Sequence, residues 1–142
     1  MKIILIVGEK NLCRSILLSE YLKKTLKEKG KSEIEVKSAG IMAMPDIPVE
    51  NEVIEELKKL NINGKFCSRN LLKQDVIEAN FIFTVNSKIK NVILNKFPEK
   101  QNFIFTIKEF AGEDEIDFID EKITADETKA LIDKCIEKII NL

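Results

Sequence analysis

The sequence predicts an α/β fold in which a four-stranded parallel sheet lies between two layers of helices. Three observations favour this fold. Short apolar segments alternate along the chain with longer segments of helical periodicity, which is the pattern of parallel strands joined by crossover helices. The first segment is apolar at almost every position, as in a central strand buried on both faces. The 142 residues contain no linker or repeat, so one domain, residues 1–142, is expected.

Each predicted strand is a short run of mostly apolar residues. The four strands are Lys2–Val7, Glu33–Lys37, Asn80–Val85 and Asn102–Ile107. The first is rich in β-branched residues and ends at Gly8, and the second alternates apolar with polar residues. After the second strand, a loop begins at Ser38 and contains Pro45 and Pro48.

Helical periodicity marks the segments between these strands. A helix is predicted from Ser15, with apolar residues three and four apart, and Gly30 ends it. The other helices are predicted at Val49–Leu60, Leu72–Ala79, Ser87–Phe97 and Ala125–Leu142. Ser87 is expected to cap its helix. An acidic loop, Glu109–Glu121, precedes the last helix.

Composition excludes several classes of function. Lys and Arg number 23 against 24 Asp and Glu, so no basic excess indicates a nucleic-acid partner. No apolar run approaches the ~20 residues of a membrane span, and the N-terminus lacks a signal peptide, so a cytoplasmic protein is expected. The chain has no His, and Cys13, Cys67 and Cys135 form no C-x-x-C pair. No metal and no cofactor are therefore expected.

The loop after the first strand, residues 8–15, is the best candidate for a functional site. Ligands of such folds bind beyond the carboxyl ends of the strands, where this loop lies. A strand–loop–helix junction directs backbone N–H groups and the helix dipole toward one point. Arg14 adds a planar fork suited to an oxyanion, and Asn11 tolerates a left-handed conformation that a tight loop needs. The loop therefore predicts an anion-binding cradle rather than an ordinary turn.

This loop also resembles a known signature. Asn11, Cys13, Arg14 and Ser15 match, in order, the V-C-x-G-N-x-C-R-S motif of the low-molecular-weight protein tyrosine phosphatases, whose relatives include arginine phosphatases and some arsenate reductases. Further matches follow in the family's order at Ser38-Ala39-Gly40, Ser68-Arg69 with Leu71, Phe97-Pro98, Glu109-Phe110-Ala111-Gly112 and Asp117-Phe118-Ile119-Asp120. The resemblance spans nearly the whole chain and implies a three-layer α/β/α fold with a four-stranded parallel sheet.

The resemblance implies a two-step phosphoryl transfer through a Cys thiolate at the first position of the loop. The implied phosphate-binding residues are Glu9, Lys10, Asn11, Leu12, Cys13 and Arg14, through the loop amides and the Arg14 side chain. The implied loop-bracing residues are Asn11, Ser15 and Ser38. Asp120 is the implied general acid, with Asp117 as an open alternative, and Arg69 is expected to stay solvated or to pair with the acidic loop.

The sequence departs from the family pattern at the position that matters most. Gly8 stands where the family has its nucleophilic Cys, so no thiolate can form there. Lys10 replaces a Gly, and strain is expected if that position needs a positive φ. Cys67 replaces a His that often braces the loop Asn. Glu121 replaces the Pro after the acid, and Lys122 replaces an aromatic residue.

Two hypotheses about function follow. The first is a pseudophosphatase that binds phosphate, a phosphomonoester or a phosphorylated protein without turnover, because Gly8 carries no nucleophile. The alternative is an active phosphomonoesterase or arsenate-reductase-like enzyme that uses Asp120, Cys13 or Cys67 instead. Cys13 is more readily explained as a packed residue near the pocket floor. The third cysteine, Cys135, is explained as a core residue.

Overall fold

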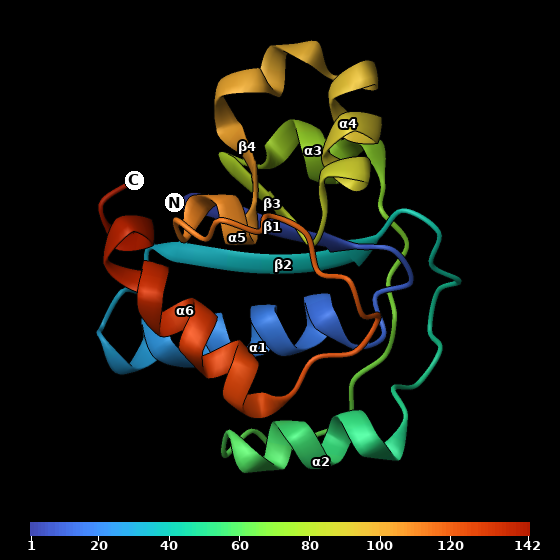
Figure 1. The fold of residues 1–142 in the computed structure, drawn as a ribbon, viewed down its shortest axis with the longest axis vertical. Coiled ribbons are helices and arrows are strands. Elements are labelled where there is room, and N and C mark those ends of the chain that lie inside the picture. Colours follow the sequence, from blue (N-terminus) through green and yellow to red (C-terminus); the bar gives the residue numbers. More distant parts are fainter.

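The computed structural model describes residues 1–142 and contains one sheet of parallel strands in the order β2-β1-β3-β4 (Figure 1). The strands are β1 (Lys2–Gly8), β2 (Ile34–Gly40), β3 (Phe81–Thr84) and β4 (Ile104–Thr106). All pairs in the sheet are parallel, and β1 pairs with both β2 and β3. The predicted four-stranded parallel sheet is therefore confirmed.

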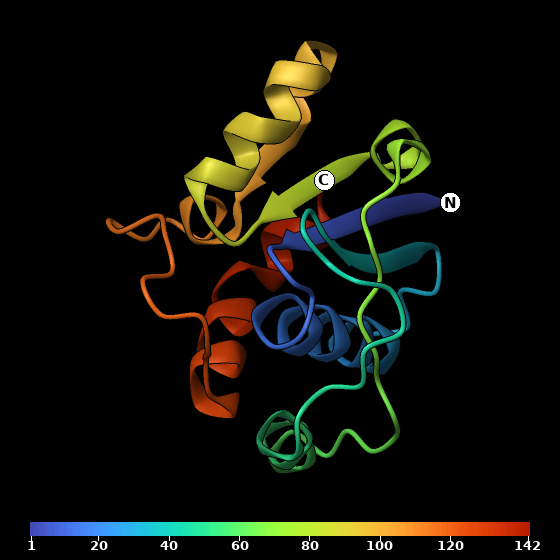
Figure 2. The same cartoon turned by 90° about the vertical axis from the view of Figure 1, so that its right-hand side faces the viewer.

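Helices cover both faces of this sheet. They are α1 (Arg14–Glu28), α2 (Asn51–Lys59), α3 (Lys73–Glu78), α4 (Ser87–Lys96), the 3-10 helix η1 (Pro98–Phe103), α5 (Ile107–Phe110) and α6 (Ala125–Ile140). Figures 1 and 2 both show α1, α2 and α6 on one side of the sheet and α3 and α4 on the other. This is the three-layer arrangement that the sequence predicts. None of the helices combines the length and the apolar character that a membrane crossing requires.

The central strand explains where the candidate loop lies. Ile4, Leu5, Ile6 and Val7 have no exposed surface, because β1 is covered by helices on both faces and by strands on both edges. The chain leaves β1, returns through α1 to β2 on one side, and later enters β3 on the other side. The loop after β1 therefore lies at the topological switch point, where ligands of such sheets bind.

The structure corrects two strand boundaries. Strand β2 continues through Gly40, three residues beyond the predicted end at Lys37, because Ser38-Ala39-Gly40 pairs with the last residues of β1. Strand β4 is shorter than predicted, since η1 precedes it and α5 begins at Ile107. The Thr106 hydroxyl and the Glu109 carboxylate cap α5 reciprocally, a local signal that the prediction of an acidic loop overlooked.

The cap of α4 also differs from the prediction. Asn86 is the capping residue, and its side chain accepts a hydrogen bond from the Ile89 N–H at 2.9 Å. Ser87 is the first helical residue, and its N–H and hydroxyl donate to the Asp117 carboxylate at 2.8 and 3.0 Å. Asp117 therefore ties the acidic loop to the start of α4.

Candidate functional site

The loop between β1 and α1 is held by its close approach to the end of β2. The N–H groups of Ile41 and Met42 donate to the carbonyl oxygens of Gly8 and Glu9 at 3.1 and 2.8 Å. A Cβ atom on Gly40 would lie 2.6 Å from the Glu9 carbonyl oxygen, closer than real Cβ contacts. Gly40 is therefore required for this approach, which gives the family's S-A-G motif a physical reason.

Asn11 fixes the curl of the loop. Its φ of 58° places it in the left-handed region, as its sequence position suggests. The side chain is 2% exposed and donates to the hydroxyls of Ser15 at 2.8 Å and Ser38 at 3.2 Å. Its carbonyl oxygen accepts from the Arg69 N–H at 2.8 Å. Asn11 thus contacts both Ser15 and Ser38, and the bracing role of these three residues stays a prediction.

The curled loop leaves its hydrogen-bond donors unused within the chain. No backbone N–H from Glu9 through Cys13 donates to another group of the protein. Arg14 follows at the start of α1, is 8% exposed, and pairs with no carboxylate of the chain. Most residues from Glu9 through Cys13 are at least partly exposed, so the donors are open to a ligand that enters from solvent. This loop therefore has the donors of an anion site, at the positive end of the α1 dipole.

Gly8 lines the same cavity as these donors. A Cβ atom at this position would lie 2.9 Å from the Ser15 Oγ and 3.2 Å from the Ser15 Cβ. The Ser15 hydroxyl accepts from Asn11 but donates to no group of the chain, and Ser15 is 1% exposed. The Ser15 hydroxyl thus lies next to the position that a Cβ atom of residue 8 would occupy. It is a further hydrogen-bond donor without a partner beside the loop.

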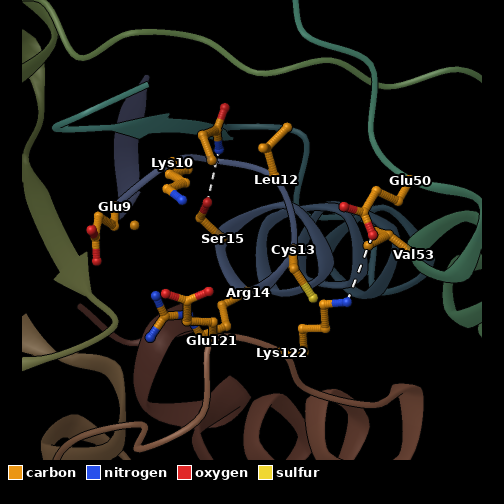
Figure 3. A pocket seen from close by; sticks show the side chains of 12 residues that line it. Glu9, Lys10, Leu12, Cys13, Arg14, Ser15, Glu50, Val53, Glu121 and Lys122 are labelled. Atoms are coloured by element: carbon orange, nitrogen blue, oxygen red, sulfur yellow. Dashed lines mark hydrogen bonds and ion pairs between the residues drawn. The ribbon is translucent and has the colours of Figure 1, made fainter. Parts of the chain in front are cut away.

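These residues surround a cavity of about 150 Å³, shown in Figure 3. The lining residues are Gly8, Glu9, Lys10, Asn11, Leu12, Cys13, Arg14, Ser15, Glu50, Val53, Glu121 and Lys122. Eight of these twelve form the predicted loop, residues 8–15.

The remaining lining residues come from two other segments. Glu50 and Val53 lie at the start of α2, and Glu121 and Lys122 lie before α6. The Lys122 ammonium is 3.6 Å from a Glu50 carboxylate oxygen and also contacts Glu52 (Figure 3). These ion pairs raise the pKa of Lys122, mainly through its hydrogen bond to Glu52. They connect α2 with the acidic loop beside the cavity, although such exposed pairs contribute little stability.

The predicted acid lies outside the cavity lining. Asp120 is exposed, whereas the next residue, Glu121, lines the cavity. Asp117 is held by Ser87, as described above, and does not line the cavity either. The role of Asp120 as a general acid stays a prediction. Glu121 is the carboxylate of the acidic loop that lines the cavity together with Arg14.

Neither cysteine near the loop has the surroundings of a nucleophile. Cys13 is half-buried, and its thiol contacts the Ile123 carbonyl oxygen at 3.9 Å. Burial raises the pKa of Cys13 above its usual value, and this outweighs the lowering effects of Ile123 and Arg14. Cys67 is exposed and lines a separate depression with Ser38 and Arg69. Cys135 is fully buried in the core, as predicted, and burial raises its pKa to about 11.

Two further expectations are resolved by the loop geometry. Lys10 has no positive φ, so a side chain at this position meets no backbone strain. Arg69 does not reach the acidic loop. Its side chain stays 40% exposed, and its guanidinium pairs with Asp75 instead. The chain contains no group of three or more His, Cys, Asp or Glu side chains placed to hold a metal ion.

Two residues that line the cavity, Glu50 and Val53, were not predicted from the sequence, because no local motif connects them to the loop.

Residues 3–140 match the family described as low molecular weight phosphotyrosine protein phosphatase. The chain belongs to this family. The match covers nearly all of β1, the other three strands and the whole loop of residues 8–15, so membership of this family accounts for the fold.

Several phosphatases of this family are similar to the chain. A protein-arginine-phosphatase from Geobacillus stearothermophilus is 29% identical over 144 residues, covering 96% of this chain and 95% of that protein. The structure of the YwlE arginine phosphatase from the same organism superimposes with a TM-score of 0.84, covering 99% and 94% of the two chains. The low molecular weight protein tyrosine phosphatase from T. tengcongensis is 33% identical, with a TM-score of 0.84 and coverage of 97% and 99%.

Proposed function

We propose that this chain is a phosphate-binding member of the phosphatase family that holds a phosphorylated protein without hydrolysing it. One observation carries the proposal: the unpaired loop donors and Arg14 line the same cavity as Gly8, a residue that has no side chain with which to attack phosphorus. Binding and covalent catalysis use different groups in this family, so the loss of one group need not remove the other.

The binding half of the proposal rests on the unused donors. The amides of Glu9–Cys13 and the Arg14 guanidinium make no hydrogen bond that a ligand would have to break. A tetrahedral oxyanion accepts such bonds through several oxygens at once, and bonds to charged acceptors are the stronger ones. The missing thiolate also removes a negative charge that would repel a phosphate dianion.

The absence of turnover rests on the remaining candidate nucleophiles. Cys13 holds its proton at neutral pH because burial raises its pKa, and a protonated thiol is a poor nucleophile. Cys67 opens into a different depression, on the side of Asn11 and Ser38. No observation therefore favours the alternative of an enzyme that acts through another cysteine.

The rim of the cavity favours phosphoarginine as the bound group. Glu50 and Glu121 line the cavity, and a carboxylate suits the guanidinium that carries the phosphoryl group in phosphoarginine. Lys122 occupies the place of the aromatic residue that would stack on a phenyl ring. Two relatives, from Geobacillus stearothermophilus and Bacillus subtilis, are protein-arginine-phosphatases, which supports the same choice.

Inorganic phosphate is expected to raise the Tm of the wild-type protein. A ligand at about 100 times its Kd stabilises the folded state by about 2.7 kcal/mol. For a domain of this size that energy corresponds to a Tm increase of several degrees. Differential scanning calorimetry in phosphate, with chloride at equal ionic strength as control, measures the effect. Equal Tm values in the two salts would contradict the proposed anion site.

A further inference from the structure

The Arg69 main chain joins the anion-binding loop to the end of β2. Its N–H donates to the Asn11 side-chain carbonyl at 2.8 Å, and its own carbonyl accepts from the Gly40 N–H at 2.9 Å. Asn11 determines the left-handed turn of the loop, and Gly40 permits its close approach. The position of Arg69 therefore affects both contacts that give the loop its shape.

Asp75 in turn holds Arg69. Its two carboxylate oxygens each lie 2.8 Å from a guanidinium nitrogen of Arg69, which is the two-pronged geometry that restricts both side chains. Asp75 is 8% exposed and also accepts from the Leu72 N–H at 2.8 Å, at the start of α3. The carboxylate is thus fixed by α3, on the opposite face of the sheet from α1 (Figure 2).

We infer that Asp75 is a positioning residue for the anion site and acts through Arg69 and Asn11. The chain of contacts runs from α3 to Asp75, to Arg69, to the Asn11 amide, and from there to the loop N–H groups. Asp75 does not line the cavity. This inference rests on the proposed anion site and adds the residue that holds the site in its binding geometry.

Replacement of Asp75 tests the inference. Asp75→Asn removes the charged fork, so Arg69 and the Asn11 turn lose their restraint. We expect the affinity for inorganic phosphate to fall about tenfold, within the range of coupling between residues of one contact network. Isothermal titration calorimetry measures the affinity, and the amide NMR signals of residues 9–14 report the loop. Asp133→Asn, which removes the ion pair with Lys129 on α6 away from the loop, is the matched control.

A double-mutant cycle separates positioning from a general structural effect. If Asp75 acts through Asn11, the tenfold loss disappears when Asp75→Asn is introduced into an Asn11→Ala background. Arg69→Gln provides a second variant if Asp75→Asn fails to fold, and the same loss is expected. Folded variants that bind phosphate with wild-type affinity, or losses that add fully in the double mutant, would overturn the inference. Failure of the wild-type protein to bind phosphate would instead refute the proposed function.

Discussion

The Gly8→Cys variant is expected to hydrolyse phosphoarginine or an aryl phosphate, whereas the wild-type protein does not. A thiol at residue 8 would start beside Ser15, near the N-terminus of α1, and would share the cavity with the unpaired N–H groups of Glu9–Cys13. Such surroundings lower a thiol pKa. Loss of a nucleophile commonly costs several orders of magnitude, so we expect a gain of at least about a thousandfold over wild type.

The Gly8→Ala variant is the matched control for this gain. Both substitutions bring a Cβ to 2.9 Å from the Ser15 hydroxyl, which must shift slightly to admit it. Only cysteine adds a thiol, so only Gly8→Cys is expected to gain activity in a steady-state assay of phosphate release. Equal rates for Gly8→Cys, Gly8→Ala and wild type would contradict the assignment of Gly8 as the missing nucleophile.

The Arg14→Ala variant is expected to lose about 99% of the affinity for phosphate, or about 3 kcal/mol, because two charge-assisted hydrogen bonds are lost. Its thermal stability without ligand is expected to stay the same or to rise. Arg14 pairs with no carboxylate of the chain, so the folded state loses no ion pair and is relieved of a nearly buried charge. Calorimetric titration and thermal unfolding of the same samples measure the two effects.

Arg14→Lys provides the control, because lysine keeps the charge but lacks the planar fork. An affinity between those of wild type and Arg14→Ala is expected. A lower Tm for ligand-free Arg14→Ala, together with unchanged phosphate affinity, would mean that Arg14 supports the fold rather than the ligand.

The sequence predicts the parts of the site that are local in the chain. Segment 8–15 contains the loop donors, the left-handed Asn11 and the start of α1, all set by neighbouring residues. Ser38 could be assigned only through the resemblance, and the structure gives its reason, a 3.2 Å hydrogen bond from Asn11. The fold class followed because alternation of strands and helices restricts the topology strongly.

The distant parts of the site could not be predicted in the same way. Arg69 pairs with Asp75 because α3 begins immediately after the segment that contacts Asn11, and a solvated Arg is indistinguishable from a paired one in sequence. Glu50 reaches the cavity only through the packing of α2 beside α1. The acidic loop contains many carboxylates, and the sequence does not show which of them lines the cavity. The path of the backbone brings Glu121 to the cavity and leaves Asp120 outside it.

The most direct test is a phosphorus NMR titration of the unmodified protein into a phosphoarginine peptide. Our account predicts that the phosphoramidate signal shifts as it enters the loop and keeps its full area during prolonged incubation. The Arg14→Ala variant should need about a hundredfold higher concentration to produce the same shift. Two results would contradict this account. One is an inorganic phosphate signal that grows in proportion to the amount of wild-type protein. The other is a phosphorus signal from a phosphorylated protein that persists after the peptide is removed.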